Sequence, residues 1–107
     1  MQSKIKKVRD ALLTTTSNIG HYEFLGHTDR YVVWSEDGES TSTYHDNGKY
    51  IQVITGTIDL FTKTEFDSLV DQIQNSLSDA GISYTLESVQ YEDETQYIHY
   101  EWRFEVS

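Results

Sequence analysis

The sequence predicts an α+β fold: an antiparallel-dominated mixed sheet of about four to five strands, with two helices packed on one face. Three observations lead to this prediction: a helical apolar period near the N-terminus, a strand that passes into an amphipathic helix between Ile51 and Gly81, and strict alternation in the last ten residues. The predicted order is α-β-β-β-α-β-β. At 107 residues we expect one domain, residues 1–107, with a modest core.

The first helix is predicted from apolar residues at i, i+3, i+7 and i+8, namely Ile5, Val8, Leu12 and Leu13. Four cations lie mostly on the other side of this helix. They form either a solvated outer face or a docking face for an acidic neighbour. These cations are Lys4, Lys6, Lys7 and Arg9.

Two short strands are predicted next, at His21–Leu25 and Arg30–Ser35, on either side of a GHTD turn. A polar stretch from Asp37 to Lys49 follows, with turn signals at Asp37-Gly38 and Asn47-Gly48. A loop of this length in a small domain is usually functional, so residues 37–49 are expected to form a polar loop or hairpin arm that contacts a partner. The candidate contact residues are Asp37, Glu39, Tyr44, His45, Asp46 and Lys49.

The stretch from Ile51 to Gly81 contains the most complete helix start signal. Thr62 is predicted as the N-cap with Glu65 completing a capping box, and Phe61 and Phe66 have the spacing of a hydrophobic staple. Gly81 is predicted to end the helix in a left-handed conformation. In the strand before it, Gly56 indicates a bulge or a close backbone approach.

The last two strands are separated by the reversal Glu92–Thr95. In the first of them the apolar face changes phase between Leu86 and Val89, whereas the second alternates cleanly from Ile98 to Val106. The predicted core consists of residues on the inner faces of these elements: Leu12, Val33, Ile58, Phe66, Leu69, Val70, Ile73, Leu77, Tyr100, Trp102 and Phe104.

The charge and the composition argue against several classes of function. The formal net charge is −10, which argues against a nucleic-acid-binding surface and against docking on an anionic membrane. There is no cysteine, no signal peptide and no apolar run of membrane-spanning length, so an intracellular protein is expected.

No pattern in the sequence indicates catalysis. The four histidines are scattered without an i, i+4 partner, no GxSxG turn or phosphate-binding glycine loop occurs, and Glu92-Asp93-Glu94 lacks the ligand spacing of a calcium loop. We therefore expect no enzyme activity, no metal and no cofactor.

The segment GTIDLFTKTEFDSLVDQIQNSLSDAGISYTLESVQYEDETQYIHYEW, residues 56–102, resembles the tail terminators of long-tailed bacteriophages and prophages. The matching features are a strand ending in IDLFTK, a helix with a D-x-I-Q core, and VQYEDETQYIHYEW in the closing hairpin. HYEFLGHTDRYVVWSEDG upstream also fits, so the resemblance covers about residues 20–106.

The resemblance implies a structural protein of the virion that assembles in the host cytoplasm. Such a protein forms a ring, possibly a hexamer, that caps the tail tube, ends tail polymerisation and offers a surface for head joining. Its partners would be copies of itself, the tail-tube protein and a head-completion or connector protein, with DNA passing through without specific binding. Two alternatives stay open: a head–tail connector or stopper, and a small acidic regulatory module that binds a basic protein.

Overall fold

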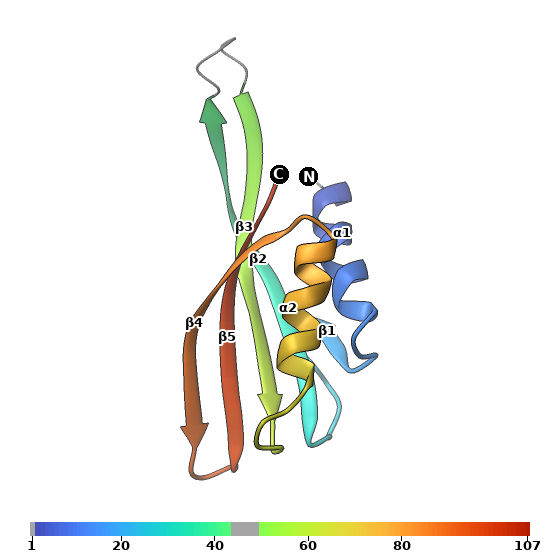
Figure 1. The fold of residues 1–107 in the computed structure, drawn as a ribbon, viewed down its shortest axis with the longest axis vertical. Coiled ribbons are helices and arrows are strands. Elements are labelled where there is room, and N and C mark those ends of the chain that lie inside the picture. The colour runs from blue at the N-terminus through green and yellow to red at the C-terminus, as the bar shows by residue number, and fades with distance from the viewer. Residues whose placement is uncertain (1, 44–49) are drawn as a thin grey trace.

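A computed structural model describes residues 2–43 and 50–107 of the chain. The elements follow the predicted order α-β-β-β-α-β-β (Figure 1). They are α1 (Gln2–Leu13), β1 (Ile19–His21), β2 (Arg30–Thr43), β3 (Tyr50–Thr62), α2 (Leu69–Asp79), β4 (Ser83–Glu92) and β5 (Tyr97–Val106).

The strands form one mixed sheet in the order β1-β2-β3-β5-β4. All neighbours are antiparallel except β1, which runs parallel to β2. The prediction of a strand at His21–Leu25 is wrong in its bounds, because β1 ends at His21. Tyr22 has a φ of +73°, which turns the chain away while its N–H still donates to the Trp34 carbonyl at 2.8 Å.

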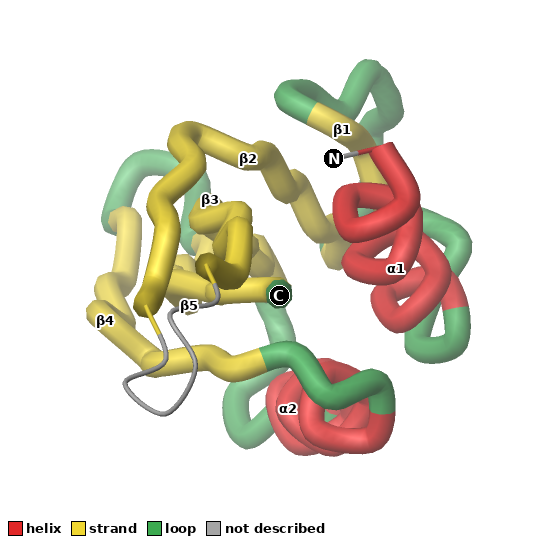
Figure 2. Tube along the Cα trace, turned by 90° about the horizontal axis from the view of Figure 1, so that it is seen from above, coloured by secondary structure: helices red, strands yellow, loops and turns green. Residues whose placement is uncertain are grey.

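Both helices cover the same face of the sheet, as predicted (Figure 2). Trp102 and Phe104 of β5 are almost completely buried in the core between the two layers. It also contains predicted residues from both helices and β3, namely Leu12, Ile58, Leu69, Ile73 and Leu77, with Val70 and Tyr100 partly buried against it. Neither α1 nor α2 has the length and hydropathy of a membrane-spanning helix.

Val33 lies on the other face of the sheet and is only half-buried, so its placement in the core is wrong. Val32 and Trp34 point into the core instead. Because successive side chains of a strand alternate between faces, burying Val32 and Trp34 necessarily turns Val33 away from the helices.

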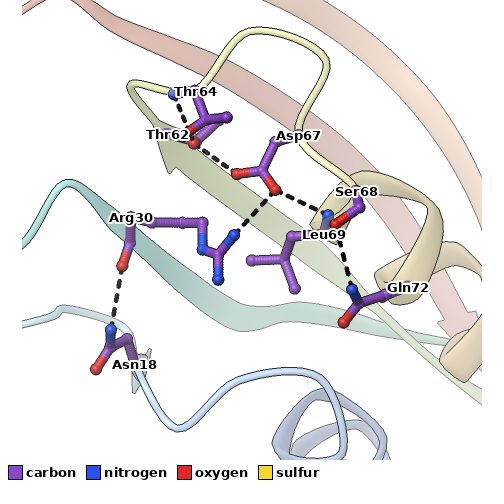
Figure 3. A network of polar contacts seen from close by, with 8 residues as sticks. All are labelled: Asn18, Arg30, Thr62, Thr64, Asp67, Ser68, Leu69 and Gln72. Carbon is purple, nitrogen blue, oxygen red and sulfur yellow. Dashed lines mark hydrogen bonds and ion pairs between the residues drawn. The ribbon is translucent and has the colours of Figure 1, made fainter.

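The start of α2 also differs from the prediction. The Thr62 backbone pairs with both Arg30 and Ile98 in the sheet, so Thr62 ends β3 and does not cap the helix. α2 begins at Leu69, whose N–H donates to the Asp67 carboxylate at 2.9 Å (Figure 3). Phe66 therefore lies in the preceding turn, with φ +56° and 91% exposure, and its assignment to the core is wrong.

Three predictions from the sequence are confirmed. Gly81 ends α2 with a φ of +73°. A Cβ on Gly56 would collide with the Ser35 carbonyl oxygen and the Phe104 ring, so this glycine permits a close approach between strands. The register shift in β4 lies between Leu86 and Ser88, where the apolar phase changes.

Candidate functional site

The β2–β3 hairpin extends beyond the rest of the sheet (Figure 1). Pairing between β3 and β5 stops at Ile54 and Val106, whereas β2 and β3 continue to pair with each other up to Thr43 and Tyr50. We call this two-stranded extension, residues 39–43 and 50–53, the arm. It contributes to a long molecule with principal extents of 52 × 22 × 22 Å.

The predicted contact residues divide between the arm, its base and the tip. Asp37 and Glu39 lie in β2, so this part of the predicted stretch is a strand of a hairpin. The prediction for the other four, Tyr44, His45, Asp46 and Lys49, falls outside the described residues.

Asp37 is held within the protein at the base of the arm. Its carboxylate accepts two hydrogen bonds from the Arg103 guanidinium, at 2.8 and 3.1 Å, and one from Thr55 at 3.0 Å. The hydrogen bonds from Arg103 are the main reason that the pKa of the Asp37 carboxyl is lowered. Asp37 thus ties β2 to β5 at the bulge between Glu36 and Gly38.

The face of the sheet away from the helices, here called the open face, carries a row of aromatic rings. Tyr31 stacks between Phe24 and Phe61 with centroid distances of 5.1 and 4.9 Å, and Phe61 stacks on His99 at 4.3 Å. Such a row could serve as a base-stacking platform in a cationic groove. Carboxylates surround this one, which disfavours that use: Asp59, Glu92 and Glu101 all lie on the open face.

Asp59, His99 and Glu101 are the residues of the described chain that come together in a metal-like arrangement. One potential ligand atom from each lies within 4.8 Å of the others, and all three are half-buried. Nε2 of His99 is 2.7 Å from Oδ1 of Asp59, so a hydrogen bond between the two side chains accounts for their approach. Sequence spacing did not reveal this group, because its members meet across two strands.

One lateral edge of the molecule is formed by α1, β1 and the loop that follows β1; we call it the α1 edge. It contains an apolar groove of about 260 Å³ lined by Ile5 and Trp34 and flanked by Lys6 and Arg9. His21 also lines the groove, with its ring stacked between Trp34 and Tyr22 at 4.1 Å from each. In the loop that follows β1, Leu25 is 85% exposed.

Glu36 contacts two side chains on the polar side of this edge. Its carboxylate accepts a hydrogen bond from the Tyr22 hydroxyl and lies 2.8 Å from Nε2 of His21. Burial acts to raise the pKa of the Glu36 carboxyl, but the contacts with Tyr22 and His21 together outweigh it and lower that pKa. The hydrogen bond between Tyr22 and Glu36 also raises the pKa of the Tyr22 hydroxyl.

The opposite lateral edge is β4, which within the described residues pairs with β5 on one side only. Three large apolar side chains of this strand are exposed on the helix side of the sheet: Leu86, Val89 (51%) and Tyr91 (60%). Val89 and Tyr91 border an open depression that also contains Ile98 and Lys63. We call the surface formed by β4 and by the exposed side chains of Leu86, Val89 and Tyr91 the β4 edge.

No signal in the sequence marks these residues of the two edges as exposed. The apolar alternation of β4 was visible, but alternation predicts a buried face. Exposure depends on which strand lies at the edge and where the helices stop, and neither is encoded locally. Exposed Leu25 stands alone in a loop and gives no periodic signal.

No family model matches the chain. No curated protein sequence matches it either. The solved structures to which the chain is similar include a chain in the virion of a native gene transfer agent (GTA) particle, with a TM-score of 0.57 and 13% sequence identity. The superposition covers 99% of this chain and 92% of the other, so the two share a fold over almost their whole lengths.

Proposed function

We propose that this chain is a structural protein of virion assembly that caps a tail tube, ends tail polymerisation and offers a surface for head joining. The observation that carries the proposal is the shared fold with a chain of a gene transfer agent virion, at nearly full coverage of both chains. The resemblance of residues 20–106 to tail terminators agrees with it. The role is non-enzymatic, and its partners are other virion proteins.

The architecture suits a ring. A heterologous contact joins two different surfaces of identical subunits and closes into a ring when the rotation permits. The five-stranded sheet has two dissimilar lateral edges, one basic and grooved at α1 and one apolar and acidic at β4. The arm supplies a third surface, in the direction of the long axis, that can reach a tube or a neighbour (Figure 1).

The charge suits the passage of DNA. At −10, the protein repels phosphate instead of releasing its counterions, so DNA could move through a ring without being retained. Asp59 and Glu101 place part of this charge on the open face. A ring structure with a neutral or basic channel would contradict this part of the proposal.

The proposal is tested by adding the tagged chain to polymerising tail-tube protein from the same particle. A terminator stops growth at a defined length and stays at one end of the tube, as seen by electron microscopy. The same tag is used for capture with portal or connector protein. Capture of the portal without the tube would favour a connector, and tight binding to neither would favour a regulatory module.

A further inference from the structure

We infer that copies of this chain contact one another head to tail, with the β4 edge of one copy seated on the α1 edge of the next. This inference rests on the proposed function, because it assigns the surfaces through which the ring would form. The occupant of each edge is a second copy of the chain.

The β4 edge has the properties of an interface. β4 has ten residues, and no other strand that the structure describes pairs with its outer side. Such an edge is a ready template for association, and natural proteins usually protect it with lysine, proline or a covering element. β4 has no lysine and no proline, and it exposes Leu86, Val89 and Tyr91 side by side along the strand. Neighbouring exposed apolar side chains of this kind mark interaction surfaces.

The α1 edge offers the complementary shape. Its groove is lined by His21, half-buried Ile5 and nearly buried Trp34, with Lys6 and Arg9 beside them. The exposed Tyr22 side chain stacks on His21, and the loop after β1 carries exposed Leu25 on the same edge. Figure 2 places α1 and β1 at one side of the molecule and β4 at the other. One subunit can therefore use both edges at once, as a heterologous ring requires.

Charge favours contact between the β4 edge and the α1 edge over contact between two β4 edges. α1 carries four cations and one carboxylate, although the protein as a whole is strongly acidic. Residues 83–96, which form β4 and its turn, carry four carboxylates and no cation: Glu87, Glu92, Asp93 and Glu94. Contact between two β4 edges would bring carboxylates together, whereas contact between β4 and α1 brings carboxylates to Lys6 and Arg9.

The absence of cysteine from the chain permits a direct test by disulfide cross-linking. Leu25→Cys and Val89→Cys each introduce one thiol at an exposed position, so both variants should fold. The double variant is oxidised as concentrated purified protein and again during tail assembly. We expect a ladder of covalent multimers from the double variant, and mixed dimers from the two single variants combined.

Controls separate the pairing from random collision. Asp71→Cys with Val89→Cys places the first thiol on the exposed side of α2 and should give no ladder. Adding Lys6→Glu and Arg9→Glu to the cross-linking variant should abolish the ladder, and adding Glu92→Lys and Glu94→Lys to that protein should restore it. Lys7→Glu is the matched control on the same helix, because the Lys7 amine lies toward Gly81 and away from the groove; the ladder should persist.

Two outcomes would overturn the inference. One is efficient dimerisation of Val89→Cys alone with no mixed product, which would mean a symmetric β4–β4 contact. The other is the absence of any multimer while the protein still limits tail length; the proposed function would then stand and this interface would be wrong. A ladder without any effect on tail length would support the interface and count against the proposed function.

Discussion

Arg30 and Asp67 form an ion pair beside the start of α2, with Nη1 of Arg30 3.0 Å from Oδ1 of Asp67 (Figure 3). The Asp67 carboxylate is almost fully buried and also accepts hydrogen bonds from the Thr62 hydroxyl, at 2.7 Å, and from the Leu69 N–H. One side chain thus connects the first residue of β2, the last residue of β3 and the beginning of the helix.

Replacing Asp67 by alanine should lower the free energy of unfolding by about 2–4 kcal/mol, because the Leu69 N–H at the start of α2 and the buried Thr62 hydroxyl both lose their acceptor. Asp67→Asn keeps an acceptor for the Leu69 N–H and should lose less. Urea denaturation followed by circular dichroism measures both. Equal stability of Asp67→Ala and the wild type would show that the helix start is fixed elsewhere.

Phe66, unlike Asp67, should contribute little to the stability of the protein. Its side chain is exposed and its φ is positive, so Phe66→Gly removes no core contact and relieves an unfavourable backbone conformation. The free energy of unfolding should stay within about 1 kcal/mol of the wild type. Leu69→Ala, at the buried position three residues later, should cost about 2–5 kcal/mol. A comparable loss for Phe66→Gly would mean that Phe66 packs in the core after all.

Asp37 and Arg103 should make stability depend on pH in the acid range. Because the pKa of Asp37 is lowered in the folded protein, its contribution is present above the ordinary carboxyl pKa and is lost as pH falls through the lowered value. Both side chains are more than a third exposed, so the contribution at neutral pH should be below about 1 kcal/mol.

The measurement is the urea midpoint of the wild type and Asp37→Asn at neutral pH and at pH values below about 4. The wild type should be the more stable at neutral pH, and the difference should shrink on acidification. A difference that grows as pH falls would contradict the assignment.

Removing the arm should separate folding from function. Replacing residues 41–52 by Asn-Gly joins Ser40 to Val53 through a two-residue turn and leaves the pairing of β3 with β5 intact. The shortened protein should keep its circular dichroism spectrum but lose binding to the tail tube. Unchanged ring formation and tail capping would remove the arm from the proposed function.

Much of the fold follows from local patterns. The alternation from Ile98 to Val106 defines β5 because every second side chain is apolar, and the phase change after Leu86 marks the register shift in β4. The predictions for Gly81 and Gly56 are also confirmed, since glycine adopts the positive φ at position 81 without strain and a Cβ at position 56 would collide with the Ser35 carbonyl oxygen.

The errors arise where two local signals compete. Thr62 and Glu65 fit a capping box, yet Asp67 fits a helix start as well, and strand pairing of Thr62 with Arg30 and Ile98 decides between them. Val32 and Val33 are chemically identical, so only their packing against the helices selects which is buried.

The candidate surfaces depend still more on tertiary structure. The α1 edge joins Ile5, His21 and Trp34 from three separate elements, and the exposure of Val89 follows from the position of β4 at the end of the sheet. The sequence does indicate the basic helix, and it leaves residues 37–49 open between a polar loop and a hairpin arm, because charge and turn signals are local.

We propose that this protein ends tail growth, and the most direct test of this proposal is the length of tails assembled without the protein. Electron microscopy of particles produced after deletion of its gene should show tails of abnormal and variable length that fail to join heads, with normal length restored by the wild-type chain. Tails of normal length joined to heads in its absence would contradict the account.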